Sequence, residues 1–227
     1  MVDSDTLPRV SAIVLAGGQN RRMGRDKAFL DFGGAPLIAR AIARAQAVCA
    51  EVIIVANDAD AYARILSGIK GGARVVGDVY PGKGSLGGIF SGLQAAREQY
   101  ALAVACDMPF LNGALLRYLI SLAPQADVVI PRAYEPAGEG KDAPRYDQLA
   151  VKESGLQPML AVYSKRCLAP MQARLLANDL RIINFFDEVR VRVVEPNEVG
   201  RFDPQGLSFF NINTPEDLRT ALSLREG

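Results

Sequence analysis

The stretch VSAIVLAGGQNRRMGRDKAFL, residues 10–30, carries the strongest structural signal in the sequence. Its first seven residues form an apolar run that favours a buried β-strand over 10–16. A glycine pair follows, and then four cations at Arg21, Arg22, Arg25 and Lys27. Glycines after a strand let a ligand approach the backbone, and clustered N–H groups and cations favour an anion. We therefore expect a polyphosphate site here, with a solvated basic turn as the alternative.

Composition narrows the chemistry that the chain can perform. It has 227 residues, a formal net charge of +1 and no histidine. The absence of histidine excludes Ser-His-Asp and Cys-His catalysis and histidine-ligated zinc. A chain with almost no net charge has no long-range electrostatic attraction for nucleic acid or anionic lipid, so neither is expected as a partner. The length suits one domain over 1–227, and we expect 1–9 to be flexible.

Cysteine usage and the apolar runs favour a cytoplasmic protein. The three cysteines, Cys49, Cys106 and Cys167, are far apart, odd in number and without metal-ligand spacing. That usage suits a reducing compartment. The N-terminus lacks the charged start and apolar run of a secretory signal, and no apolar stretch approaches the roughly 18–20 residues that cross a bilayer. We therefore expect cytoplasmic localisation and no membrane partner.

Apolar runs alternate with helical patterns as far as residue 131. Continuous apolar strands separated by helices indicate a mainly parallel sheet with helices on both faces, which is a three-layer α/β fold. The predicted strands are 10–16, 51–57, 73–78, 101–107 and 126–131, and the predicted helices are 36–50, 59–69, 85–99 and 111–123.

The segments that follow the first four predicted strands are polar or rich in glycine. They read AGGQNRRMG, AND, GDVYPGKG and CDMP. Because ligands bind at the carboxyl ends of the strands in such a sheet, we expect these segments to meet on one edge and form the site.

Regularity breaks at 132–155, which is charged and rich in proline and glycine. We interpret this segment as an excursion from the core and not as a linker between domains. Apolar patterning resumes at LQPMLAVYS, followed by a predicted helix over 164–177 and a strand over 189–195. Before the last helix, Thr214 is the expected N-cap and Pro215 the first helical residue.

Two glycine-rich segments compete for a nucleotide. The first is not a P-loop, because RDK follows Gly24 where that motif requires GK[ST]. In the second, Gly82, Gly84 and Gly87 match G-x-G-x-x-G between a strand and a helix, with Asp107 further along the chain. A nicotinamide-dependent oxidoreductase is therefore an alternative, although these glycines do not follow the strand directly as that motif requires.

Four motifs, taken in order, resemble those of the molybdenum cofactor guanylyltransferases, the MobA family: LAGGQNRRMGRDK, YPGKGSLGGI, ACDMPFL and FFNINTPEDL. The resemblance covers about residues 10–222 and implies a Rossmann-like nucleotidyltransferase fold. Members transfer GMP from Mg-GTP to the terminal phosphate of molybdopterin, which forms a guanine dinucleotide cofactor and releases pyrophosphate. The resemblance thus implies Mg²⁺ as cofactor, GTP and molybdopterin (molybdenum cofactor) as ligands, and contacts with other cofactor-biosynthesis proteins and acceptor molybdoenzymes.

The resemblance also implies roles for individual residues. Lys27 would bind the phosphates and Asp107 would bind Mg²⁺, although an aspartate after a strand is often only a turn or helix cap. The chemistry of bringing two anions together adds Arg22, which would hold the triphosphate with Lys27. Asn211 and Asn213 would lie beside the pterin, with a structural role before the last helix as an equal alternative. The other implied nucleotide contacts are Leu15, Ala16, Gly17, Gly18, Asn57 and Asp78.

The chain departs from the family at GKGSLGG, where a shorter G-P-L-x-G is usual. Lys83 and Ser85 therefore have no implied role, and Ser85 is a candidate cap for the helix that follows. The segment 132–155 is longer than in the compact bacterial members. We expect it to lie near the acceptor site and to cover the acceptor.

The implied reaction agrees with the lack of histidine. A phosphate monoester is already anionic at neutral pH, so the attack needs charge neutralisation and alignment and no general base. Related cytidylyltransferases commonly show L-A-A-G where this chain has LAGG, and we expect Gly17 to admit guanine, whose donors the loop carbonyls would accept. The alternatives are a cytidylyl- or sugar-nucleotide transferase on the same fold, and a non-catalytic nucleotide-binding module.

Overall fold

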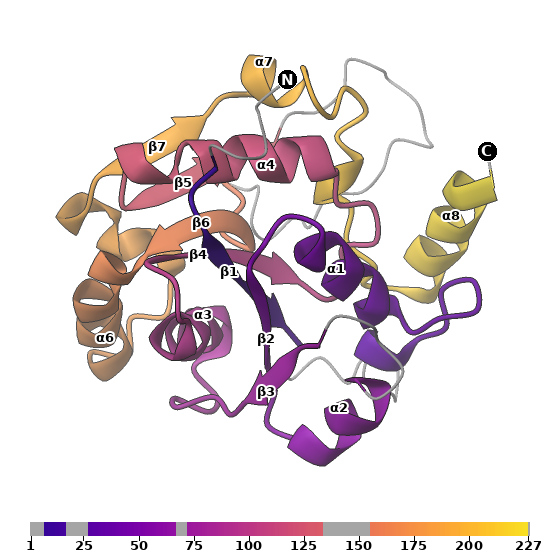
Figure 1. Cartoon of the computed structure of the whole chain (residues 1–227), viewed down its shortest axis with the longest axis horizontal. Coiled ribbons are helices and arrows are strands. Elements are labelled where there is room, and N and C mark those ends of the chain that lie inside the picture. Colours follow the sequence, from indigo (N-terminus) through magenta and orange to yellow (C-terminus); the bar gives the residue numbers. More distant parts are fainter. Residues whose placement is uncertain (1–6, 17–26, 67–71, 134–154, 227) are drawn as a thin grey trace.

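Seven strands form one sheet in the described part of the computed structural model (Figure 1). The structure describes residues 7–16, 27–66, 72–133 and 155–226. The strands lie side by side in the order β3-β2-β1-β4-β6-β5-β7. Their bounds are β1 (Val10–Leu15), β2 (Glu51–Val55), β3 (Arg74–Val76), β4 (Tyr100–Ala105), β5 (Val128–Pro131), β6 (Leu160–Ser164) and β7 (Val191–Val194).

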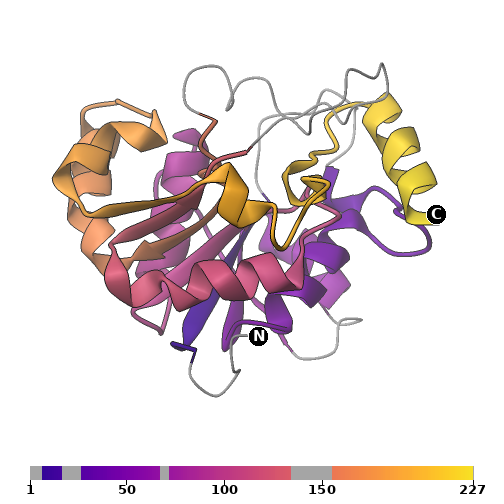
Figure 2. The same ribbon diagram turned by 90° about the horizontal axis from the view of Figure 1, so that it is seen from above.

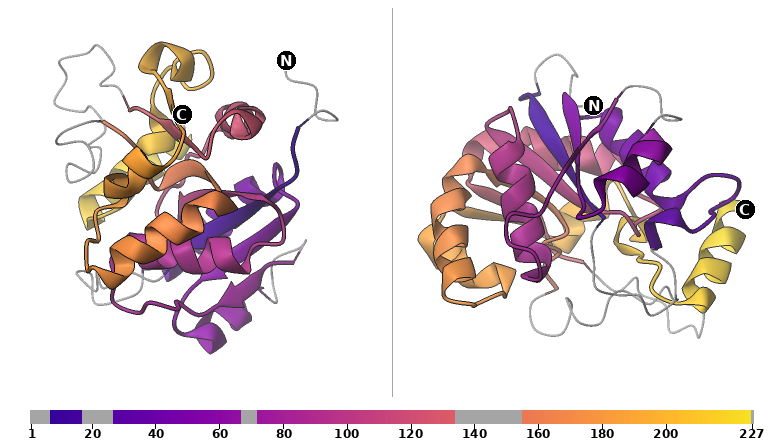
Figure 3. Two further views of the ribbon diagram at one scale, coloured as in Figure 1. Left: turned by 90° about the vertical axis from the view of Figure 1, so that its left-hand side faces the viewer. Right: turned by 90° about the horizontal axis from the view of Figure 1, so that it is seen from below.

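Helices cover both faces of this sheet (Figures 2 and 3). On one face, α3 and α6 pack against an apolar cluster that includes Ile13 and Ile53. On the other face, α1, α2 and α4 pack against a cluster that includes Val14 and Ile54. Alternate strand residues thus face opposite layers, as in a three-layer fold. The helices are α1 (Leu37–Gln46), α2 (Ala59–Leu66), α3 (Gly84–Ala95), α4 (Gly113–Ser121), α6 (Leu168–Leu176), α7 (Pro196–Val199) and α8 (Pro215–Glu226), with short 3₁₀ turns η2 (Lys27–Phe29), η3 (Ala123–Gln125), η4 (Lys165–Cys167), η5 (Ile182–Glu188) and η6 (Leu207–Phe209).

The mainly parallel α/β sheet predicted from the sequence is confirmed. Strand β1 is parallel to both β2 and β4, β2 is parallel to β3, and β5 is parallel to β7. The exception is β6, which is antiparallel to β4 and to β5. An antiparallel bridge pairs Arg132, which follows β5, with Leu156, which precedes β6. The chain therefore leaves and rejoins the sheet at the same place, and β6 runs opposite to β5. The segment 134–154 between them lies outside the described residues, as do residues 1–6.

Helix boundaries confirm one predicted cap and correct another. The Thr214 Oγ1 accepts from the Asp217 N–H at 3.1 Å, and Pro215 is the first residue of α8, as predicted. Ser85 is not the cap of α3, because that helix begins at Gly84, after Lys83. Gly82 and Gly84 adopt φ of 82° and 63°, which lets the chain turn into the helix one residue earlier than expected. None of the helices in the described ranges is long and apolar enough to span a membrane.

The glycines of α3 bring that helix unusually close to the sheet. A Cβ at Gly92 would lie 2.4 Å from Ile13 Cγ2, and one at Gly88 would lie 2.7 Å from Leu15 Cδ2. A side chain at either position would force Ile13, Leu15 or the helix to shift, so these two glycines allow α3 to pack on β1 at this separation. Helix–sheet packing therefore explains Gly88 and Gly92.

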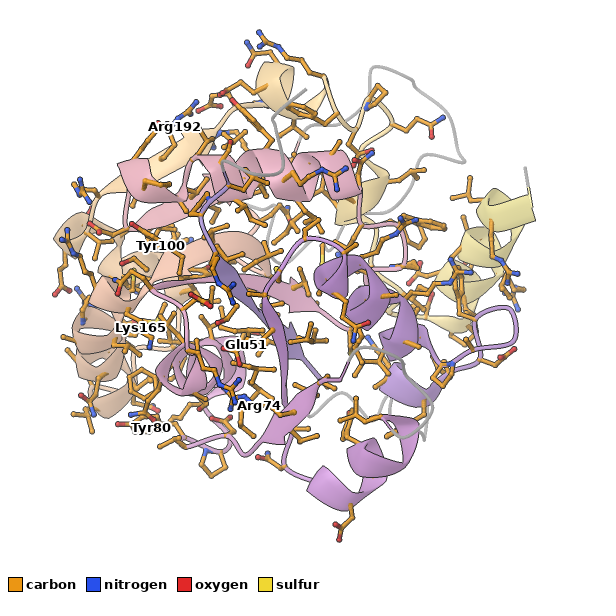
Figure 4. All side chains as sticks on the ribbon, viewed as in Figure 1. Glu51, Arg74, Tyr80, Tyr100, Lys165 and Arg192 are labelled. Atoms are coloured by element: carbon orange, nitrogen blue, oxygen red, sulfur yellow. The ribbon has the colours of Figure 1, made fainter. Side chains whose placement is uncertain are left out.

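Glu51 joins several chain segments at the amino ends of the strands. Its carboxylate accepts from Ser11 Oγ at 2.7 Å, from the Arg97 backbone N–H at 2.6 Å and from Arg74 Nε at 3.3 Å. Figure 4 shows Glu51 and Arg74 side by side. Burial raises the pKa of Glu51, but these hydrogen bonds outweigh it and hold the pKa below its usual value. This cluster ties β1, β2 and β3 to the segment that precedes β4.

Glu198 forms a second polar group, which connects α4, β7 and α7. Its Oε1 accepts from Tyr118 Oη and from Arg192 Nη2, both at 2.6 Å, and its side chain is 17% exposed. Arg192 lies on β7, near the upper rim of Figure 4. Burial raises the pKa of Glu198, but the bonds from Arg192 and Tyr118 outweigh burial and lower the pKa to about 2.

We predict that Glu198→Gln lowers the free energy of unfolding at pH 7 by about 2–3 kcal/mol. The folded pKa lies below the ordinary value of 4.5, so the ionised carboxylate stabilises the fold above that pH, and the contribution is lost as pH falls toward 2. Urea unfolding at pH 7, 4 and 2.5 measures this. The difference between wild type and variant should shrink toward the lowest pH, and a constant difference would contradict the assignment. Glu188→Gln, at an exposed carboxylate, is the control.

Candidate functional site

The carboxyl ends of the first four strands meet on one edge of the sheet, as predicted. Parallel pairing sets Leu15 level with both Val55 and Ala105, and Val55 level with Val76. The segments that follow β1, β2, β3 and β4 therefore leave the sheet at the same height. Any ligand bound by more than one of them lies across this edge.

Lys27, Asp107 and Asn213 lie together at this edge. The Lys27 Nζ donates to Asn213 Oδ1 at 2.7 Å and is 3.8 Å from Asp107 Oδ2. The Lys27 and Asp107 side chains are only 11% and 19% exposed, so water screens this ion pair less than one on the surface. Three residues far apart in the sequence thus place a cation, a carboxylate and an amide in one half-buried group.

The C-terminal segment is fixed against the end of β4. The Ile212 N–H donates to the backbone carbonyl of Asp107 at 3.0 Å. This bond places Asn213 next to Asp107 and within reach of Lys27. Asn211 has a different environment: it is 9% exposed and its Nδ2 donates to the Phe209 carbonyl at 2.9 Å. Of the predicted Asn-x-Asn pair, only Asn213 joins the Lys27 group through a contact between described residues.

A second polar group follows β2 and β3. Asn57 Oδ1 accepts from the Asp78 backbone N–H at 3.3 Å. The Asp78 Oδ1 accepts from Ser91 Oγ at 2.8 Å and from the Tyr80 N–H at 3.0 Å. The structure thus brings the two predicted nucleotide contacts Asn57 and Asp78 together, and adds Ser91 on α3, which the sequence reasoning missed. A serine in the middle of a largely apolar helix was the available signal.

The first carbonyls of the glycine-rich loop already have protein partners. The Leu15 carbonyl accepts from the Cys106 N–H at 3.1 Å. The Ala16 carbonyl accepts from Tyr62 Oη at 2.8 Å, in a buried contact. The sequence reasoning did not single out Tyr62, although a tyrosine on the buried side of an amphipathic helix needs a partner for its hydroxyl. The predicted site residues Gly17, Gly18 and Arg22 lie outside the described residues.

Lys83 is held at the end of α6. Its Nζ donates to Asn178 Oδ1 at 2.7 Å. Nearby, Gln172 Nε2 donates to Tyr80 Oη at 3.1 Å, so the segment between β3 and α3 rests on α6 at two points. These contacts give Lys83 a structural partner, which the sequence alone did not supply.

The Lys27 group has the charges that a polyphosphate site requires. A lysine point charge neutralises phosphate oxygens, and a single carboxylate beside it can share a divalent cation with a phosphate. Within the described ranges no group of three or more His, Cys, Asp or Glu side chains could hold a metal ion.

Comparison with known proteins identifies the family. The model for the MobA-like NTP transferase domain matches residues 12–190. The chain belongs to this family. A molybdenum cofactor guanylyltransferase of Desulfosudis oleivorans is 34% identical over 214 residues, covering 93% of this chain and 94% of that one. A probable molybdenum cofactor guanylyltransferase of Pelotomaculum thermopropionicum is 35% identical over 219 residues, covering 96% and 95%.

Solved structures agree with the fold. Molybdopterin-guanine dinucleotide biosynthesis protein A from Archaeoglobus fulgidus aligns with a TM-score of 0.74 at 24% identity, covering 96% of this chain and 99% of that one. As a member of the MobA-like NTP transferase family, the protein is a nucleotidyltransferase. The nicotinamide-dependent alternative therefore does not hold. Of the glycines in the G-x-G-x-x-G match that suggested it, Gly82 and Gly84 serve the turn into α3 with positive φ, and Gly87 lies against the Tyr80 carbonyl.

We predict that Lys27→Ala weakens the binding of a nucleoside triphosphate by at least about tenfold, because it removes a half-buried cation and leaves Asp107 without that neighbour. Asn213→Ala should weaken binding less, since it frees the lysine but keeps its charge. Calorimetric titration with GTP and with pyrophosphate measures both effects. Lys165→Ala is the matched control, because Lys165 follows β6 and its N–H bonds the Gln99 carbonyl just before β4 (Figure 4), away from the carboxyl ends of the parallel strands. Unchanged pyrophosphate affinity in Lys27→Ala would remove Lys27 from the phosphate site.

Proposed function

We propose that the protein transfers GMP from Mg-GTP to the phosphate of molybdopterin, forming a guanine dinucleotide cofactor and releasing pyrophosphate. The names of its relatives support the acceptor class and the guanylyl group. The observation that carries the proposal within the chain is the half-buried group of Lys27, Asp107 and Asn213 at the carboxyl edge of the sheet.

The chain's own residues match the needs of this reaction. Attack by one phosphate on another brings two anions together, so the barrier falls when cations neutralise charge and hold the reactants in line. Lys27, fixed by Asn213, would hold the triphosphate in a defined position. No proton must be removed from the attacking phosphate, and the sequence contains no histidine to do so.

Asp107 fits the role of the protein's ligand for Mg²⁺. Mg²⁺ prefers oxygen ligands and is commonly held by one or two carboxylates, with the substrate phosphates and water completing the shell. Asp107 supplies one such carboxylate at the end of β4, next to the cation that would contact the phosphates. The ion, when bound, would polarise phosphate oxygens and offset their charge.

We propose that the nucleoside lies toward β2 and β3. Asn57 and Asp78 form a hydrogen-bonded pair at the ends of these strands. Both offer side-chain oxygens, which accept the N–H groups that a guanine edge presents. The carbonyls of Leu15 and Ala16 each accept one internal hydrogen bond, as Asn57 Oδ1 does, and each keeps a second lone pair that a base donor could use.

The direct test is a transfer assay with purified protein, Mg²⁺, a nucleoside triphosphate and molybdopterin. Formation of a guanine dinucleotide and pyrophosphate from GTP is the expected result. Transfer from CTP or to a sugar phosphate would indicate the cytidylyl- or sugar-nucleotide alternative. Tight GTP binding without transfer to any phosphate acceptor would indicate a non-catalytic module.

We predict that Asp107→Asn lowers kcat by at least about 100-fold, because it removes the negative charge that would hold Mg²⁺ while keeping the side-chain size. The fold should be retained, since the backbone carbonyl of Asp107 that bonds Ile212 is unchanged. Mg²⁺ titration of the rate and of GTP affinity should show a matching loss of metal dependence. Asp31→Asn, in the exposed turn before α1, is the control. Activity within a few-fold of wild type would refute the assignment.

We also predict that GTP is preferred over CTP by at least about 100-fold in kcat/KM. A site that offers acceptors to the N1–H and N2–H₂ donors of guanine leaves them buried and unpaired when cytosine binds. Competition between the two triphosphates in the transfer assay measures the ratio directly. Equal use of both would contradict guanylyl specificity and leave nucleotidyl transfer standing.

A further inference from the structure

Ser91 is a buried serine at the centre of the second polar group. It lies on α3 and is 2% exposed. Its Oγ is 2.8 Å from Asp78 Oδ1, 2.8 Å from the Gly87 carbonyl and 2.9 Å from the Val79 N–H. A hydroxyl that touches three polar groups in a dry environment is fully engaged and cannot rotate freely.

Hydrogen-bond chemistry decides how this hydroxyl is used. It has one proton and two acceptor lone pairs, and it accepts from the Val79 N–H. The proton goes to the Asp78 carboxylate in preference to the Gly87 carbonyl, because an ionised acceptor forms the stronger bond. Asp78 Oδ1 therefore receives two donors, Ser91 Oγ and the Tyr80 N–H, which together fix the plane of the carboxylate.

The other oxygen of that carboxylate is directed elsewhere. Among the contacts between described residues, Asp78 Oδ2 accepts no hydrogen bond, and the Asp78 side chain is partly exposed. Close approach of α3 makes the arrangement possible, since a Cβ at Gly87 would lie 3.0 Å from the Tyr80 carbonyl and 3.4 Å from Asp78 Oδ1. The helix thus holds one oxygen of Asp78 and leaves the second for a ligand.

We propose that Ser91 is a positioning residue for base selection: it orients Asp78 so that Oδ2 accepts the N–H groups of the nucleobase. This inference rests on the proposed function, because it takes the guanine nucleotide as the ligand. Guanine carries an N1–H and an adjacent amino group, both of which a carboxylate can accept. Hypoxanthine, the base of ITP, lacks the amino group. The ratio of the affinities for GTP and ITP therefore measures the hydrogen bond between Asp78 and the amino group of guanine.

The test measures the affinity of the full-length protein for GTP and for ITP without acceptor. Wild type should bind GTP at least about tenfold more tightly than ITP. In Ser91→Ala the ratio should fall toward one, while affinity for pyrophosphate stays unchanged because the Lys27 group is untouched. Ser164→Ala, equally buried at 2% exposure and level with the first residue of β4, away from the carboxyl ends of the parallel strands, should keep the wild-type ratio.

Two further variants separate positioning from simple loss of stability. Ser91→Thr keeps the hydroxyl and should restore the ratio, and Ser91→Cys, with a weak donor of similar size, replaces Ser91→Ala if that variant does not fold. In an Asp78→Ala background, Ser91→Ala should change the ratio no further. A ratio unaltered in Ser91→Ala or Ser91→Cys, independent effects in the double variant, or equal wild-type binding of GTP and ITP would each overturn the inference. Failure of transfer to molybdopterin would instead refute the proposed function, because binding is measured without acceptor.

Discussion

The close contact between α3 and β1 is the constraint on which the rest of the architecture depends. Gly88 and Gly92 face Leu15 and Ile13 at distances that leave no room for a Cβ. Because the helix lies this near, Gly87 and Ser91 contact the turn after β3, and the Ser91 hydroxyl donates to the carboxylate of Asp78. A larger residue at these glycines would push α3 away from β1 and lengthen the hydrogen bond between Ser91 and Asp78. Packing in the core therefore determines the geometry of Asp78 at the edge of the sheet.

Two segments far apart in the sequence, at Lys27 and at Ile212 and Asn213, are joined at the same edge of the sheet. Lys27 and Asn213 are 186 positions apart and are linked by a 2.7 Å hydrogen bond, while Ile212 bonds the backbone after β4. An apolar cluster that includes Phe32 and Phe210 packs beneath this link. The chain carries almost no net charge, so the polyphosphate binding that we propose would have to be local, with this link keeping Lys27 in place.

Sequence reasoning predicted the parallel core because continuous apolar runs are buried on both faces, and that signal is local. Convergence of the four loops followed from topology. The direction of β6 was not predictable, since apolar composition is the same for parallel and antiparallel strands and only pairing with β4 decides it. Ser91 and Tyr62 were missed for a related reason. The role of a polar side chain on a buried helix face depends on its hydrogen-bond partner, and here both partners are distant in sequence.

The topology also limits how a nucleotide can lie. Asp78 follows β3 and Asp107 follows β4, and the order β3-β2-β1-β4 separates these strands by three spacings, roughly 14 Å. That distance agrees with the proposal that an extended nucleoside triphosphate lies across the strand ends, with its base toward Asn57 and Asp78 and its phosphates toward Lys27. The carbonyls of Leu15 and Ala16 lie between the two groups and hold Cys106 and Tyr62. These two bonds stabilise the middle of the edge, between the Asn57–Asp78 pair that we propose for the base and the Lys27 group that we propose for the phosphates.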